Sequence, residues 1–254
     1  MSSIAEKLTT VAENVPKVYD AGKQTGHDEY WSAIWDAIQI GGKRTEYASF
    51  FRYEYWNEDT FRPKYDMRLT GSSSLMFDRF GGEAKTTTKS IDLAQIFEDC
   101  GVVLDTSQST NLSNFFYYSS VSRVPAISAV GCTSTIIGTF AACSKLETVD
   151  KFILKEDGSN IFRDIFLNDS SLRNIIIEGT IGHSIDFKHS PLSKDSILSI
   201  FNALSDTITG MTLTLRLSAV NTAFETSAGA SDGSTSEEWA TLIATKPNWT
   251  ISLV

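Results

Sequence analysis

The fold is decided by three short segments of one pattern: FFYYSSV (residues 115–121), FAACSKL (140–146) and FLNDSSL (166–172). Each has the form Phe-x-x-(Tyr/Cys/Asp)-Ser-x-aliphatic, and the first phenylalanines of successive segments are 25 and 26 residues apart. Three residues after each segment, a strand-like run begins at Val124, Val149 or Ile175. A fixed period of about 20–29 residues with one short strand per unit is typical of leucine-rich repeats. The sequence therefore predicts a leucine-rich-repeat-like solenoid.

The same alignment predicts the interior of this solenoid. Phe115, Phe140 and Phe166 occupy one position of consecutive units, so we expect their rings to be buried and stacked in register. A single unit cannot bury its apolar face alone, so three or more units must stack. Cys143 falls at a tight interior position, where cysteine acts as a small apolar side chain.

The expected fold class is α+β, and the chain divides into four expected regions. These are a helical N-terminal segment (1–42), an aromatic-rich connecting region (43–90), the solenoid (91–192) and a C-terminal α/β cap (193–254). Within the cap, Ser193 is placed to start a helix, and residues 212–217 alternate as a strand does. Residues 237–244 predict a short helix, and 249–254 a closing strand. An atypical terminal unit of this kind covers the open end of a solenoid.

The N-terminal segment carries a heptad stripe. Apolar residues recur at intervals of 4, 3, 4 and 3, namely Ile4, Leu8, Val11, Val15 and Val18. This a/d spacing predicts a coiled-coil seam, and β-branched residues along it favour three strands or more over two. The stripe spans about two and a half heptads, and Pro16 removes a helical hydrogen bond within it. An amphipathic helix that packs on its own chain is therefore kept beside the trimeric seam.

Composition excludes several functional classes. The 254 residues include 22 basic and 31 acidic side chains, a net charge of −9, which disfavours nucleic acid as a partner. No apolar run approaches the roughly 18 residues of a membrane span, and the first residues lack the apolar core of a signal peptide. We therefore expect no membrane insertion. The three cysteines are too few for a disulfide framework.

No catalytic constellation stands out in the sequence. His183, Asp186 and His189 lie at a spacing that fits zinc poorly, because zinc ligand pairs follow tighter intervals. The chain has no Gly-x-Ser-x-Gly elbow, no Walker loop and no dinucleotide-binding glycine motif. We accordingly expect no catalytic residue, no metal site and no cofactor.

One pair of residues is a candidate for partner binding. A solenoid binds through exposed positions of successive coils, and beside the aligned phenylalanines Tyr117 and Tyr118 face Ala141-Ala142 and Leu167-Asn168 in the next two units. Tyrosines offer a rigid apolar face with a polar tip, which suits a sugar or a protein surface. The alternative is that both rings pack against the aromatic stretch at 47–65.

The segment FAACSKLETV (140–149) resembles the repeat of BspA-type leucine-rich-repeat proteins. Four further strings resemble tail-region proteins encoded by phages and prophages of gut Firmicutes: IAEKLTTVAEN (4–14), KVYDAGK (17–23), DTFRPKYD (59–66) and KPNWTISLV (246–254). The resemblance covers nearly the whole chain. The chain departs from the family where Arg163 takes the place of Leu112 and Ile137, and in having few leucines at the repeat positions.

The resemblance implies a virion structural protein of the tail or a fibre. It further implies a homotrimer that contacts other tail proteins and binds a glycan or a protein on the host cell surface. Two other functions remain open: a bacterial surface or effector protein that binds a host protein, and a tail enzyme that cleaves glycans.

Overall fold

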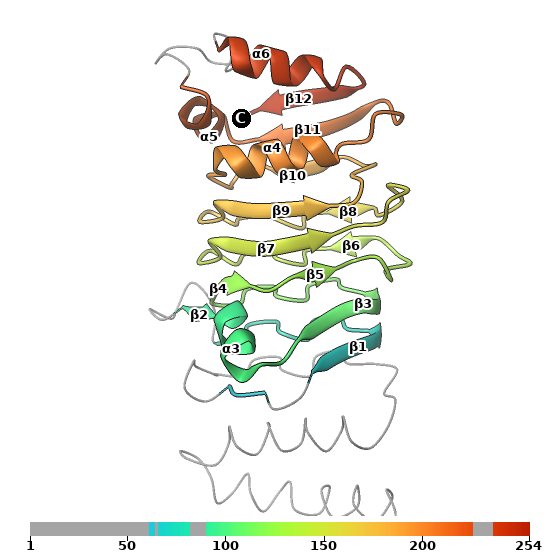
Figure 1. Cartoon of the computed structure of the whole chain (residues 1–254), viewed down its shortest axis with the longest axis vertical. Helices are drawn as coiled ribbons and strands as arrows, with labels where there is room; N and C mark the ends of the chain where they lie inside the picture. Colours follow the sequence, from blue (N-terminus) through green and yellow to red (C-terminus); the bar gives the residue numbers. More distant parts are fainter. Residues whose placement is uncertain (1–60, 64–65, 82–89, 226–235) are drawn as a thin grey trace, which may run out of the picture.

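A computed structural model describes residues 61–63, 66–81, 90–225 and 236–254 (Figure 1). The predicted N-terminal helical segment and its seam residues Ile4, Leu8, Val11, Val15 and Val18 lie outside the described residues. Within the described ranges the protein is a mixed α/β structure with four helices, and every named strand pair is parallel.

The strands and helices follow one another in a simple order. The strands are β1 (Met67–Ser72), β2 (Ile91–Asp92), β3 (Leu104–Asn111), β4 (Val121–Val124), β5 (Ile127–Ser128), β6 (Ile136–Ile137), β7 (Thr148–Ile153), β8 (Phe162–Arg163), β9 (Asn174–Glu178), β10 (Ile185–Phe187), β11 (Met211–Leu215) and β12 (Trp249–Leu253). The helices are α3 (Leu93–Cys100), α4 (Lys194–Ala203), α5 (Leu217–Ala223) and α6 (Glu237–Ala244). Figure 1 shows the strands lying one above another along the long axis of the molecule.

Four parallel sheets run along this axis. One contains β2, β4, β7 and β5, with β9 also paired to β7; the others are β1-β3, β6-β8 and β10-β11-β12. Val124 pairs with Val149, and Val149 pairs with Ile175, which confirms the predicted alignment of these strands. The parallel pairing also extends beyond the segment 91–192, because β1 pairs with β3 and β12 with β11.

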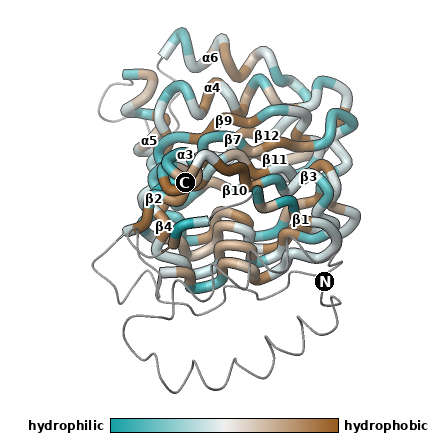
Figure 2. Tube along the Cα trace, turned by 60° about the horizontal axis from the view of Figure 1, so that its bottom comes forward, coloured by the Kyte–Doolittle hydropathy of each residue, from teal (hydrophilic) through white to brown (hydrophobic). Residues whose placement is uncertain are grey.

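The strands bury one side and expose the other. In β9 the exposure alternates residue by residue, with Ile175 and Ile177 buried and Ile176 exposed. Figure 2 shows hydrophobic segments interspersed with hydrophilic ones along the described chain. This period of two places one row of each strand in a shared apolar interior.

A column of phenylalanine rings fills the interior, but its register differs from the predicted one. Phe116, rather than Phe115, stacks on Phe140, with ring centroids 5.8 Å apart and planes 11° apart. Phe140 stacks on Phe166 at 5.3 Å, as predicted. Phe77 and Phe187 extend the column below and above, at 5.3 Å from Phe116 and 4.6 Å from Phe166. We call these five rings the phenylalanine column.

The predicted place of Phe115 in the column is therefore wrong by one residue. Phe115 is buried beside the column and meets Phe116 edge-on at 4.8 Å. The sequence alignment also placed Arg163 at the position of Leu112 and Ile137. Arg163 does pair with Ile137, but the Asn114 amide donates to the Ile137 carbonyl, and this register places Leu112 beside Ile136 instead. The stretch from Phe116 to Val124 is one residue shorter than the corresponding stretches that end at Val149 and Ile175. The loop before β4 is therefore one residue shorter, and the strands still pair in register.

Each unit bends sharply on both sides of its column ring. Residues with a left-handed backbone lie two before and two after the phenylalanine in four successive units: Leu75 and Arg79, Asn114 and Tyr118, Gly138 and Ala142, and Asp164 and Asn168. Non-glycine residues in this conformation cost roughly 1–2 kcal/mol each. The bends recur in four units, and backbone hydrogen bonds between neighbouring units hold them in place.

Helix α4 closes the edge of the main sheet above β9. Its Ser196 and Ser199 hydroxyls accept hydrogen bonds from the amides of Ile175 and Ile177, each at 2.9 Å, where another strand would supply carbonyls. The Ser196 hydroxyl also donates to the Arg173 carbonyl at 3.0 Å. Ser193 caps the helix, as the sequence predicts. The helix thus supplies acceptors for amides at the edge of the sheet, which would otherwise be open to pairing with a further strand.

We expect Ser196→Ala to lower the free energy of unfolding by about 1–3 kcal/mol, because it leaves a buried amide without an acceptor. Ser199→Ala should cost less, since this side chain is only half-buried and water can reach the freed amide. Urea unfolding followed by circular dichroism measures both. Ser218→Ala, on the exposed side of α5, is the control. An unchanged midpoint for Ser196→Ala would contradict an edge-closing role for this serine.

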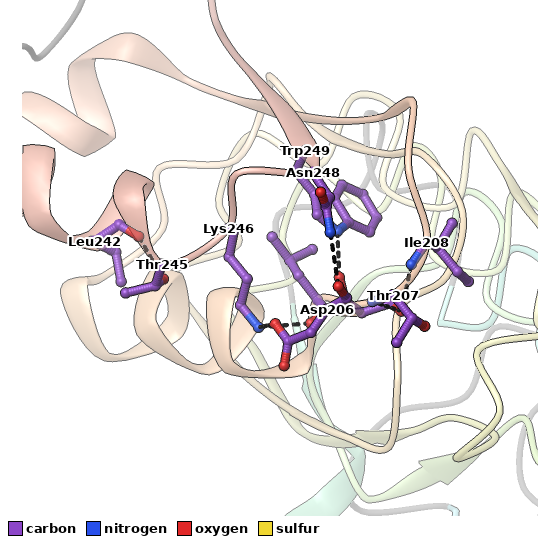
Figure 3. Close-up of polar contacts among 10 residues, drawn as sticks. Asp206, Thr207, Ile208, Leu242, Thr245, Lys246, Asn248 and Trp249 are labelled. Atoms are coloured by element: carbon purple, nitrogen blue, oxygen red, sulfur yellow. Dashed lines mark hydrogen bonds and ion pairs between the residues drawn. The ribbon is translucent and has the colours of Figure 1, made fainter.

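The C-terminal strand is anchored to the loop that follows α4 (Figure 3). The Lys246 ammonium donates to the Leu204 carbonyl at 2.8 Å and pairs with the Asp206 carboxylate at 2.7 Å. The Asn248 amide donates to the Asp206 carbonyl, and the Trp249 indole to the Ser205 carbonyl, both at 2.8 Å. These contacts fix the start of β12 beside β11.

Candidate functional site

The two predicted contact residues lie together in the loop between β3 and β4. The rings of Tyr117 and Tyr118 meet edge-on, with centroids 4.6 Å apart, and both side chains are half-buried. The Tyr118 amide donates to the Ala141 carbonyl at 3.0 Å, and the Ala142 amide donates to the Leu167 carbonyl at 2.7 Å. The tyrosines therefore occupy the same bend as Ala141-Ala142 and Leu167-Asn168, as the sequence predicts.

A third residue of this cluster was missed in the sequence. Arg79 occupies the equivalent bend of the preceding unit, and its guanidinium carbon lies 5.7 Å from the centroid of the Tyr118 ring. A guanidinium at this distance is attracted to the face of the ring. The repeat segments recognised in the sequence begin at residue 115, so nothing in the sequence linked Arg79 to the tyrosines. We call Arg79, Tyr117 and Tyr118 the tyrosine cluster.

The chemistry of this cluster suits recognition. Burial raises the pKa of the Tyr117 phenol, and the neighbouring Tyr118 raises it further, so Tyr117 is neutral at physiological pH and can donate a hydrogen bond. The ring edges and faces add an apolar surface of fixed geometry. The alternative partner of these rings, the aromatic stretch 47–65, is described only at residues 61–63.

A second cluster of polar groups is buried below the surface. The Asp169 carboxylate accepts a hydrogen bond from the Cys143 amide at 3.0 Å, and the Cys143 thiol donates to the Phe116 carbonyl at 2.8 Å. Burial raises the pKa of both side chains well above their usual values. Burial also raises the pKa of the Cys132 thiol, to about 11. These two thiols, on Cys132 and Cys143, are therefore buried and protonated at physiological pH.

Metal-binding groups are dispersed in the described part of the chain. No three histidine, cysteine, aspartate or glutamate side chains come together there in an arrangement that could hold a metal ion. Nor does any helix in those residues combine the length and the apolar character that crossing a membrane requires.

The fold defines the class as a parallel stacked α/β protein, and two half-buried tyrosines and an arginine lie together on it. Comparison of the chain with protein-family models, with curated proteins and with solved structures gave no match.

Proposed function

We propose that this chain is a non-enzymatic structural protein of a phage virion, located in the tail or a fibre, that contributes to attachment to the host surface. The virion assignment rests on the strings that resemble phage tail-region proteins, at residues 4–14, 17–23, 59–66 and 246–254. Binding rather than catalysis is the role that the stacked scaffold and its tyrosine cluster favour.

The proposal includes a finer description of the fold. The stacked region is a short leucine-rich-repeat-like solenoid of the BspA type, preceded by the helical segment 1–42 and followed by the cap 193–254. Parallel pairing of Val124, Val149 and Ile175, together with the phenylalanine column, supports the repeat. The proposed homotrimer forms through Ile4, Leu8, Val11, Val15 and Val18, and this end contacts other tail proteins.

The tyrosine cluster is the observation that carries the proposed binding role. Its two rings and one guanidinium come from neighbouring units, so the scaffold holds them at fixed distances before any partner arrives. A preorganised site of this kind loses little side-chain entropy on binding. Tyrosine and arginine are also the residues that most often dominate binding energy at interfaces. The proposed partner is a glycan or a protein of the host cell surface.

Adsorption of virions that carry Tyr117→Ala and Tyr118→Ala tests this role. We expect the adsorption rate to fall by about tenfold or more, because aromatic contacts of this kind are each worth about 1–3 kcal/mol. The purified variant should melt near the wild-type temperature. Asn168→Ala, at the equivalent bend of a later unit, is the matched control and should adsorb normally.

Two outcomes would count against this assignment. Normal adsorption at unchanged melting temperature removes the tyrosines from the binding site, and a large loss of melting temperature shows that they serve the core. Incubation of the protein with host wall glycan, followed by an assay for new reducing ends, tests the enzymatic alternative. New reducing ends would overturn the non-enzymatic assignment.

A further inference from the structure

The stacking of the backbone is interrupted at one place on the surface. Strand β8 pairs with β6, and β10 pairs with β11, but no backbone hydrogen bond joins residues 162–166 to residues 184–187. Beneath this break the Phe166 and Phe187 rings still stack at 4.6 Å, so the interior stays closed. The step between these two rings is 21 residues, shorter than the two preceding steps of the column.

A shallow depression of about 230 Å³ lies over this break. Its polar lining comes from three strands, the residue after β8 and the residue before β10, and consists of Arg163, Asp164, Ser184, Asp186, Thr212 and Thr214. Phe162, half-buried, adds an apolar wall. We call this hollow the β8–β10 depression.

Strand geometry fixes the hydroxyl groups of the depression. In β11, Leu213 and Leu215 are buried, so the alternating Thr212 and Thr214 lie on the outer face. Thr214 is the pairing neighbour of Asp186 on β10. The Ser184 hydroxyl accepts the Thr212 amide at 2.9 Å, which ties the two strands together at the lower end of the depression.

The charges of the depression are balanced. The Asp186 carboxylate is paired with the Lys188 ammonium at 3.0 Å, and the adjacent, exposed Arg163 and Asp164 carry opposite formal charges. A strongly charged ligand would therefore gain little here. A neutral ligand with many hydroxyls fits better, because threonine and serine hydroxyls both donate and accept hydrogen bonds.

We propose that the β8–β10 depression binds one neutral sugar residue of a polysaccharide. Its volume is below the roughly 300–1,000 Å³ of sites for drug-sized ligands, so it admits a single small ring. One face of a sugar ring is formed by C–H groups and suits the Phe162 wall, while the hydroxyls on its rim meet Thr212, Thr214 and Asp186. This inference rests on the proposed function in taking the sugar from the host-surface glycan.

Saturation-transfer NMR on the full chain tests the site, with the methyl glycosides of glucose, galactose, mannose and N-acetylglucosamine as probes. We expect at least one glycoside to receive saturation and to bind with a Kd of order 1 mM. Thr214→Tyr should abolish the signal by filling the depression. Ser252→Tyr, at the paired position of β12 outside the depression, is the matched control and should leave the signal unchanged.

A second variant covers the case in which Thr214→Tyr does not fold. Thr212→Val keeps the shape of the side chain but removes a hydroxyl, and it should weaken binding by about threefold or more at an unchanged melting temperature. Absence of signal for all four glycosides, or a signal that survives Thr214→Tyr in the folded protein, would overturn the proposal.

Virion adsorption separates this inference from the proposed function. If wild-type virions adsorb through this protein and Thr214→Tyr virions adsorb equally well, the depression is not the glycan site and the attachment role stands. If the purified chain binds a glycoside through the depression but does not contribute to adsorption, the sugar site stands and the attachment role falls.

Discussion

Phe140→Ala is expected to lower the free energy of unfolding by about 3–5 kcal/mol, the usual cost of removing a large ring from a core. Phe140 is fully buried and has ring neighbours on both sides, Phe116 and Phe166. Neither neighbouring ring can move into the space without breaking the backbone hydrogen bonds that join its unit to the next one. Chemical unfolding measures the loss, and Phe140→Leu, which leaves a smaller cavity, should lose less.

The same substitution tests the register of the phenylalanine column. In a double-mutant cycle, Phe116→Leu and Phe140→Leu should couple by about 0.5–1.5 kcal/mol, the range for stacked aromatic pairs. Phe115→Leu and Phe140→Leu should couple more weakly, because no ring contact joins Phe115 directly to Phe140 and the two rings are linked only through Phe116. Coupling of Phe115 rather than Phe116 to Phe140 would contradict the observed register.

Elements with strong local signals could be predicted from the sequence. Ser193 and Ser236 each cap a helix whose bounds agree with the pattern, and the acidic pair Glu237 and Glu238 begins α6 as the helix dipole favours. A strand over 212–217 and a closing strand over 249–254 were also expected. The structure shows β11 at Met211–Leu215 and β12 at Trp249–Leu253, but the expected end of the first strand is wrong, because Leu217 begins helix α5. These signals lie within a few residues, so no knowledge of the distant chain was needed.

Features that depend on distant residues were missed. Two consecutive phenylalanines, Phe115 and Phe116, fit the repeat equally well in sequence. Only the hydrogen bonds and ring contacts between units show that Phe116 is the one in register with Phe140. Strand β3 reads LDTSQSTN and lacks an apolar alternation, so its pairing with β1 gives no local signal. The β8–β10 depression was missed for the same reason, since it arises from an interruption of pairing between two units.

Three residues after the column ring, four successive units bury Ser119, Cys143, Asp169 and Ser190, and one of these side chains is a carboxyl. Asp169 follows Ser119 and Cys143 at this position, is fully buried, and has one oxygen with no hydrogen-bond partner among the described residues. No basic side chain forms an ion pair with it in that part of the chain. Burial therefore raises the pKa of Asp169 well above its usual value, against a smaller opposite effect of the Cys143 amide.

This raised pKa makes the stability of the protein depend on pH in a defined direction. Between the ordinary aspartate pKa and the raised one, the folded protein keeps a proton that the unfolded chain has lost. The contribution of Asp169 to stability is thus fully present below a pH of about 4 and is lost as pH rises, by about 1.4 kcal/mol per unit, until the folded-state pKa is passed.

Asp169→Asn should remove this dependence. The asparagine side chain has nearly the same shape, keeps an oxygen for the Cys143 amide and never carries a charge, so its advantage over aspartate should grow as pH rises above about 4. Urea unfolding of both proteins at a series of pH values measures the difference, and Glu156→Gln, an exposed carboxylate, is the control. If the difference between the wild type and Asp169→Asn stays constant with pH, Asp169 is not the buried proton-binding group. If it grows, the fully buried carboxyl has been kept at the expense of stability at neutral pH, since an amide of the same shape would fit the position better.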